Sequence, residues 1–152
     1  MADPTLTDPV PRVLVKEKIA DAGVDLLRRE FEVELGLDWD DATLAERIGE
    51  FDAILIRSGT KLTAELIERG ERLRVIGRAG TGVDNVDLEA ATKRGVIVAN
   101  APESNSVAAA EHTLAMALAL FRNVPQAHGS LTGGAWERSR FGGTSCTARR
   151  WA

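Results

Sequence analysis

The chain has 152 residues, of which 44% are hydrophobic and 28% charged, and its formal net charge is −4. These values are typical of a globular chain with a packed core, and they exclude a disordered or fibrous protein. The acidic balance argues against a nucleic-acid partner, while the single cysteine, Cys146, and the two histidines exclude an internal disulfide framework and a cysteine-rich or histidine-rich metal site.

The sequence shows no pattern for insertion into a membrane or export across one. The longest apolar run, residues 107–120, is interrupted by Glu111 and His112 and is shorter than the roughly 20 residues that span a bilayer. The first residues, 1–4, lack the basic and then apolar pattern of a signal peptide. We therefore expect a cytoplasmic protein that has no membrane partner.

Five short runs rich in valine, isoleucine and leucine predict buried strands, and helix-patterned segments separate them. The predicted strands are residues 13–15, 31–35, 53–57, 73–77 and 96–99. The predicted helices are residues 23–29, 41–48, 63–69 and 86–94, with Asp41 and Thr63 as N-caps and with Gly70 and Gly95 after the last turns. This alternation predicts an α/β fold with a doubly wound parallel sheet of the flavodoxin or Rossmann-like kind.

The alternation stops after Pro102. Residues 106–122 read as one long alanine-rich helix that ends near Pro125, and no strand pattern follows it. We therefore expect a flexible N-terminus at residues 1–11, a first domain at 12–102, and the start of a second domain at 103–135.

Polar clusters follow three of the predicted strands, at residues 57–61, 77–85 and 100–105. The carboxyl ends of parallel strands meet at one edge of a sheet, where ligands of such folds bind. Arg57 and Arg78 each offer a planar fork that suits a carboxylate or a phosphate. The glycines at 80 and 82 are open to two interpretations, a dinucleotide-binding loop or a tight turn, because Asn85 stands where a third glycine would be. We interpret this edge as an anion-binding site.

Other conspicuous residues have simpler explanations. Glu111 and His112 are adjacent on a helix, so they point to different faces and do not form a zinc-binding pair. Trp39 is expected to pack against the domain rather than to serve as a stacking platform.

Five motifs in the same order resemble the N-terminal part of the D-3-phosphoglycerate dehydrogenases, which are NAD-dependent D-2-hydroxyacid dehydrogenases. The resemblance covers about residues 12–144 and is carried by segments 16–23, 56–61, 77–87, 100–106 and 110–113. It implies oxidation of 3-phosphoglycerate to 3-phosphohydroxypyruvate in serine biosynthesis, with NAD as cofactor and a homo-oligomeric parent enzyme.

The resemblance implies that residues 12–102 are the substrate-binding domain and that residues 103–135 begin the nucleotide-binding domain. It also implies roles for individual residues. Arg57 and Arg78 would hold the anionic groups of 3-phosphoglycerate, Ser58 and Asn105 would orient it, and Thr81 would touch NAD from the substrate side. No catalytic residue is assigned within the chain. The glycine-rich NAD fingerprint and the catalytic arginine, glutamate and histidine of the family are expected beyond residue 152, so we expect the chain as given to lack activity.

The tail, residues 136–152, differs in composition from the rest. It holds four of the 19 basic residues but only one of the 23 acidic residues. The resemblance leads us to expect Glu-Leu-Tyr-Gly-Lys-Thr-Leu-Gly after Phe-x-Gly-Thr, and a one-nucleotide shift of suitable codons converts the observed tail into that sequence. We therefore expect a shifted reading frame from about residue 145.

Two alternatives to a dehydrogenase fragment stay open. The chain could be a stand-alone anion-binding module without turnover, or a structural or dimerising fragment.

The shifted frame makes a prediction about the coding DNA. Read in the neighbouring frame beyond the Thr144 codon, it is expected to encode a glycine-rich NAD fingerprint within about 20 codons. Sequencing that region tests the prediction, and an unrelated or stop-filled frame would contradict it.

Overall fold

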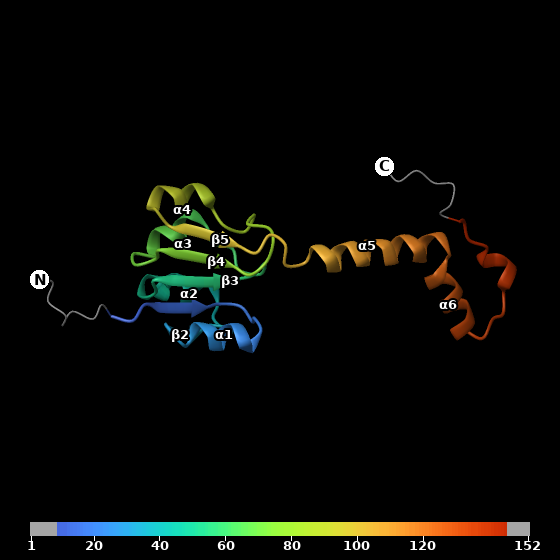
Figure 1. Ribbon diagram of the computed structural model, residues 1–152, viewed down its shortest axis with the longest axis horizontal. Coiled ribbons are helices and arrows are strands. Elements are labelled where there is room, and N and C mark those ends of the chain that lie inside the picture. Colours follow the sequence, from blue (N-terminus) through green and yellow to red (C-terminus); the bar gives the residue numbers. More distant parts are fainter. Residues whose placement is uncertain (1–8, 146–152) are drawn as a thin grey trace, which may run out of the picture. The chain divides into compact units, whose positions relative to one another are not determined.

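The computed structural model describes residues 9–145, and these divide into two compact units, one ending at Ser104 and the other beginning at Asn105 (Figure 1). The first unit alternates strands and helices. Its elements are β1 (Arg12–Val15), α1 (Asp21–Leu27), β2 (Glu32–Leu35), α2 (Asp41–Arg47), the 3-10 turn η1 (Ile48–Glu50), β3 (Ala53–Ile56), α3 (Ala64–Arg69), β4 (Val75–Arg78), α4 (Leu88–Arg94) and β5 (Ile97–Asn100).

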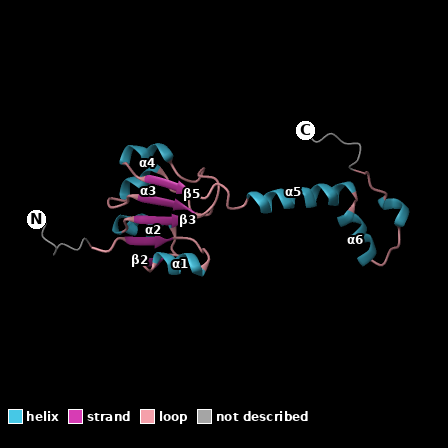
Figure 2. Ribbon diagram, in the orientation of Figure 1, coloured by secondary structure: helices cyan, strands magenta, loops and turns pink. Residues whose placement is uncertain are grey.

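The five strands form one parallel sheet in the order β2-β1-β3-β4-β5. The predicted α/β class and the parallel sheet are therefore confirmed. In Figure 2 all the strand arrows point the same way, and the loops that follow β3, β4 and β5 gather at the arrowheads. The register places Ile56, the last residue of β3, opposite Arg78, the last residue of β4.

The hydrophobic core lies between the sheet and the helices α2, α3 and α4. Leu14, Ile54 and Ile76 project from the centre of three adjacent strands and are at most 1% exposed. The core also contains Leu44 of α2, Ile67 of α3, Ala91 of α4, and Phe51. Side chains alternate between the faces of a strand, so Val13 and Val15 lie on the opposite face.

The helix boundaries follow the capping residues. Asp40, rather than the predicted Asp41, caps α2, because its Oδ1 accepts a hydrogen bond from the Thr43 N–H at 2.8 Å. Hydrogen bonding to Thr43 also lowers the pKa of the exposed Asp40 carboxyl. The predicted cap at Thr63 is confirmed, since its hydroxyl accepts from the Leu66 N–H. Gly95 ends α4 with a φ of 68°, a left-handed conformation that favours glycine.

Trp39 packs beside the core, as predicted. Its ring centroid lies 6.0 Å from that of the buried Phe51, and the Arg47 guanidinium stacks 4.5 Å from the Trp39 ring centroid. Arg47 also pairs with Glu34 of β2 at 2.6 Å and with Glu50 at 2.9 Å, and the hydrogen bond from Arg47 lowers the pKa of Glu50 to about 2. This ion-pair cluster joins α2 to the β2 edge of the sheet.

The second unit is helical over most of its described length, with α5 (Ser106–Phe121), α6 (Val124–Thr132) and the 3-10 turn η2 (Arg138–Phe141). The predicted long helix, residues 106–122, is confirmed by α5, which ends at Phe121 shortly before Pro125. The second helix, α6, was not predicted. Asn123 breaks the helix with a φ of 53°, and Pro125 stands in the first turn of α6, where a residue without an N–H is tolerated. The described residues contain no helix long and apolar enough to cross a membrane.

The flexible N-terminus predicted at residues 1–11 and the shifted frame predicted from about residue 145 lie almost wholly outside the described residues. They stay predictions.

A matched pair of substitutions tests the core. Leu14→Ala is expected to lower the free energy of unfolding by about 2–5 kcal/mol, because it removes buried apolar contacts and leaves a cavity. Leu88→Ala, at a side chain that is 46% exposed, is expected to change it by no more than about 0.5 kcal/mol. Urea unfolding measures both values, and equal losses would contradict the assigned core.

Candidate anion-binding site

The candidate site lies at the carboxyl edge of the sheet. In the order β2-β1-β3-β4-β5, the chain leaves β1 in one direction and β3 in the other, so a crevice forms between the ends of these two strands. Arg57 follows β3 directly, and Arg78 ends β4 next to it. The parallel register therefore brings the two predicted arginines to neighbouring positions at one edge.

A hollow of about 440 Å³ opens beside this crevice. It is lined by Lys18, Ile19, Ala20, Arg57 and Ala79. Arg57 Nη1 donates to the carbonyl oxygen of Lys18 at 3.4 Å, so the two cationic residues are in contact. Sequence reasoning missed Lys18, although a charged residue just after β1, at the point where the strand order reverses, was an available signal.

Glu17 holds the loop that follows β3. Its Oε1 accepts from the N–H groups of Arg57 and Thr60, both at 2.8 Å, and its Oε2 accepts from the Gly59 N–H at 3.0 Å. Partial burial by itself raises the pKa of Glu17, but the hydrogen bonds outweigh it and hold the pKa below its ordinary value. Glu17 is therefore a carboxylate at neutral pH, with its charge turned toward three backbone donors.

Asn85 holds the same loop from the other side. Its Nδ2 donates to the carbonyl oxygens of Arg57 at 2.7 Å and Thr60 at 2.6 Å. Its own carbonyl accepts from the Leu62 N–H at 2.8 Å, beside a parallel bridge between Leu62 and Val86. The asparagine that replaces a third glycine thus joins the loop after β4 to the loop after β3.

Gly80 leaves room for Arg78. A Cβ at Gly80 would collide with the Arg78 guanidinium, so a side chain at this position would displace the arginine. Arg78 Nε is buried without a hydrogen-bond partner among the described residues, so its N–H group can still donate a hydrogen bond. The space that the Arg78 guanidinium occupies therefore explains a glycine at position 80.

The remaining predicted residues fall in two places. Ser58 is exposed just beyond Arg57, and Thr81 is exposed in the loop after β4, where its carbonyl accepts from Asn100 Nδ2 at 2.6 Å. Asn105 begins the second compact unit, so its role in orienting a substrate stays a prediction.

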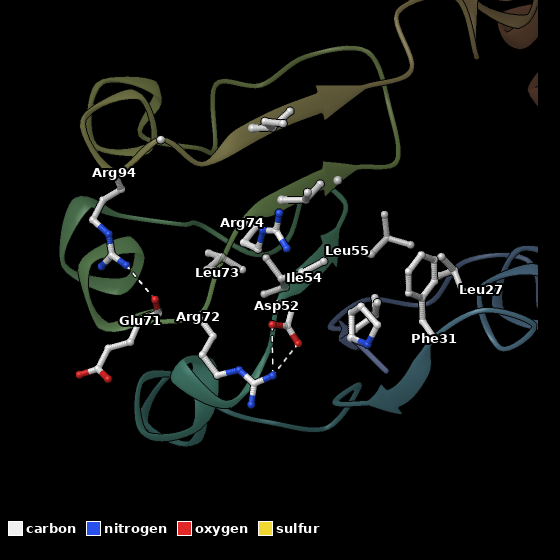
Figure 3. A pocket seen from close by; sticks show the side chains of 17 residues that line it. Leu27, Phe31, Asp52, Ile54, Leu55, Glu71, Arg72, Leu73, Arg74 and Arg94 are labelled. Atoms are coloured by element: carbon white, nitrogen blue, oxygen red, sulfur yellow. Dashed lines mark hydrogen bonds and ion pairs between the residues drawn. The ribbon is translucent and has the colours of Figure 1, made fainter. Parts of the chain in front are cut away.

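A larger hollow, of about 700 Å³, lies on the sheet face opposite the core (Figure 3). Leu27, Phe31 and Leu55 are among its apolar lining residues. Two of the arginines that line it form polar contacts, as Figure 3 shows: Arg72 contacts Asp52 at 3.0 Å, and Arg94 donates to the backbone carbonyl of Glu71 at 3.3 Å. The apolar lining makes this hollow less suited to an anion than the strand-end crevice. The described residues also contain no group of three side chains that could hold a metal ion.

The fold and this edge define a doubly wound α/β domain with cationic side chains at its strand ends. The model of the D-isomer specific 2-hydroxyacid dehydrogenase catalytic domain matches residues 13–150, and the chain belongs to this family. Among curated relatives, it is 49% identical over 148 residues to D-3-phosphoglycerate dehydrogenase 2, chloroplastic, of Arabidopsis thaliana, covering 97% of this chain and 23% of that protein. It is 45% identical to D-3-phosphoglycerate dehydrogenase of Synechocystis, covering 88% of this chain and 24% of that protein.

Solved structures agree with this assignment. The Thermus thermophilus protein TT0316 is 35% identical with a TM-score of 0.77, over 87% of this chain and 44% of that one. NAD⁺-bound 3-phosphoglycerate dehydrogenase of Entamoeba histolytica is 28% identical with a TM-score of 0.61, over 75% of this chain and 40% of that one. The chain thus spans about a quarter of the length of its curated relatives.

The joined loops can be tested at Asn85. Asn85→Ala is expected to lower the free energy of unfolding by about 1–3 kcal/mol, because it removes the hydrogen-bond donor of the Arg57 and Thr60 carbonyl groups. Asn100→Ala removes one comparable hydrogen bond at an exposed position, where water replaces it, and is expected to cost less than about 1 kcal/mol. Chemical denaturation compares the two, and a smaller loss for the Asn85 variant would contradict the assigned role.

Proposed function

We propose that this chain supplies the substrate-binding side of an NAD-dependent dehydrogenase that oxidises 3-phosphoglycerate to 3-phosphohydroxypyruvate. The observation that carries the proposal is the pair of arginines, Arg57 and Arg78, at adjacent strand ends, with Lys18 lining the same hollow as Arg57. The substrate carries a carboxylate and a phosphate, and forked guanidinium groups suit both. The names of the curated relatives support the choice of this substrate.

Each residue has a distinct part in the proposed binding. The Arg57 and Arg78 guanidiniums hold the two anionic groups, and the Ser58 hydroxyl hydrogen-bonds and orients the substrate. Thr81 approaches the cofactor from the substrate side. When bound, NAD supplies the hydride acceptor, and it is the cofactor bound in the Entamoeba histolytica structure.

The chain is proposed to bind substrate without turning it over. Oxidation of a hydroxyl needs a group that accepts its proton. An arginine stays protonated in proteins, so Arg57 and Arg78 can bind and orient but do not act as the base.

Two other functions are kept as alternatives. A stand-alone anion-binding module would use the same arginines and would bind phosphorylated and unphosphorylated anions with little discrimination. A dimerising fragment is favoured by the exposed apolar side chains of α5, including Val107 at 72% and Leu120 at 70%. Size-exclusion chromatography separates these cases, since a monomer at high concentration would exclude the dimerising fragment.

Calorimetric titration with 3-phosphoglycerate tests the proposed function. Arg57→Ala and Arg78→Ala are each expected to weaken binding about 10-fold to 100-fold, which corresponds to the loss of a charge-assisted hydrogen bond of about 1.5–3 kcal/mol. Arg69→Ala serves as the control, because Arg69 forms an exposed ion pair with Glu65 on α3.

The same samples are assayed for reduction of NAD with 3-phosphoglycerate. No reduction above background is expected, and any turnover by the 152-residue chain would contradict the proposed division between binding and catalysis. Equal affinity in the wild-type protein and both arginine variants would contradict the assigned site. Equal affinity for glycerate and 3-phosphoglycerate would instead favour the anion-binding module.

A further inference from the structure

We propose that Glu17 is a positioning residue that shapes the substrate-binding loop, residues 57–60. The inference rests on the proposed function, because the loop carries Arg57 and Ser58. Glu17 itself does not contact the substrate in this proposal. It acts by fixing the backbone from which the Arg57 side chain extends.

The Glu17 carboxylate accepts hydrogen bonds from three backbone N–H groups of the loop. The N–H groups of Arg57, Gly59 and Thr60 point to the two oxygens of Glu17 at 2.8–3.0 Å, across at least 40 positions of sequence. Hydrogen bonds to an ionised acceptor are roughly twice as strong as neutral ones. The backbone of the loop therefore surrounds the charge of a residue that follows β1.

The loop is also held at its carbonyls. Asn85 Nδ2 donates to the oxygens of Arg57 and Thr60, while Glu17 accepts from the N–H groups of the same two residues. The backbone at both ends of the loop is thus bound on both of its polar groups. The Arg57 side chain remains exposed beside the hollow. This arrangement fixes the base of the arginine, and apart from the Nη1 hydrogen bond to Lys18 its guanidinium donors are available to a ligand.

Glu17 lies between two lysines, and its negative charge is compatible with a neighbouring anion site. The residues that follow β1 face different surroundings: Lys16 is 9% exposed, Glu17 faces the loop, and Lys18 lines the hollow. A bare carboxylate beside an anion site would repel the substrate, but here three N–H dipoles offset its charge. Gly59 permits the close approach, since a Cβ there would lie 3.0 Å from Glu17 Oε2.

Glu17→Gln is the discriminating variant. It keeps the shape of the side chain but replaces one acceptor oxygen with an amide donor, which cannot accept from a backbone N–H. Glu17→Asp keeps the charge on a shorter side chain and is expected to restore part of the effect. Glu89→Gln is the matched control, because it removes the same charge from an exposed ion pair with Lys93 on α4.

Backbone hydrogen exchange of the 152-residue chain tests the loop directly. In Glu17→Gln, the amides of Arg57, Gly59 and Thr60 are expected to exchange at least about tenfold faster, while those of β3 and β4 keep their wild-type rates. Titration with 3-phosphoglycerate is expected to show about tenfold weaker binding, with partial recovery in Glu17→Asp and no change in Glu89→Gln.

The two readouts separate this inference from the proposed function. Failure of the wild-type chain to bind 3-phosphoglycerate would contradict the proposed function, and the exchange rates of the loop amides would still decide whether Glu17 orders the loop. Unchanged loop exchange in Glu17→Gln would overturn the inference. Exchange that is faster equally over the whole sheet would also overturn it, because Glu17 would then have a purely structural role. Wild-type affinity for 3-phosphoglycerate in a variant whose loop amides exchange faster would overturn it as well.

Discussion

The parallel register of β1, β3 and β4 is the constraint on which the site depends. Parallel strands end at the same edge, so residues that follow them are brought together whatever their separation along the chain. Glu17 and Lys18 follow β1, Arg57 follows β3, and Arg78 ends β4. The buried side chains of Leu14, Ile54 and Ile76 maintain that register, because a slip by one residue would turn each of them away from the core. Core packing thus sets the spacing of the charged groups.

The loops at this edge are ordered by polar side chains rather than by packing. Glu17 binds N–H groups and Asn85 binds carbonyl groups of one loop, so backbone that leaves the sheet still has its hydrogen bonds satisfied. Gly80 contributes by leaving space for the Arg78 guanidinium. A glycine-rich loop after a strand therefore serves here to place an arginine, although the same spacing of glycines also occurs in loops that bind a dinucleotide.

Some parts of the structure were predictable, and others were not, for identifiable reasons. The position of Arg57 and Arg78 at neighbouring strand ends was predictable, because a buried strand is recognisable in the sequence and its last residue marks the edge of the sheet. Lys18 was missed although it follows β1 at the point where the strand order reverses. Glu17 was missed because nothing local distinguishes a carboxylate that binds a loop 40 positions away. The helix α6 was missed because Pro125 was taken as a stop, whereas it occupies the first turn of a new helix.

The sequence by itself determined the alternation of strands and helices, the parallel sheet that follows from it, and the two arginines at its edge. Local hydrophobic pattern and capping chemistry are sufficient for these features, since they act over a few residues. Only the tertiary structure decided that Glu17 and Asn85 hold the same loop and that Lys18 shares a hollow with Arg57. Those contacts join residues 25 or more positions apart, and the order in which the strands pair is what brings them within hydrogen-bonding distance.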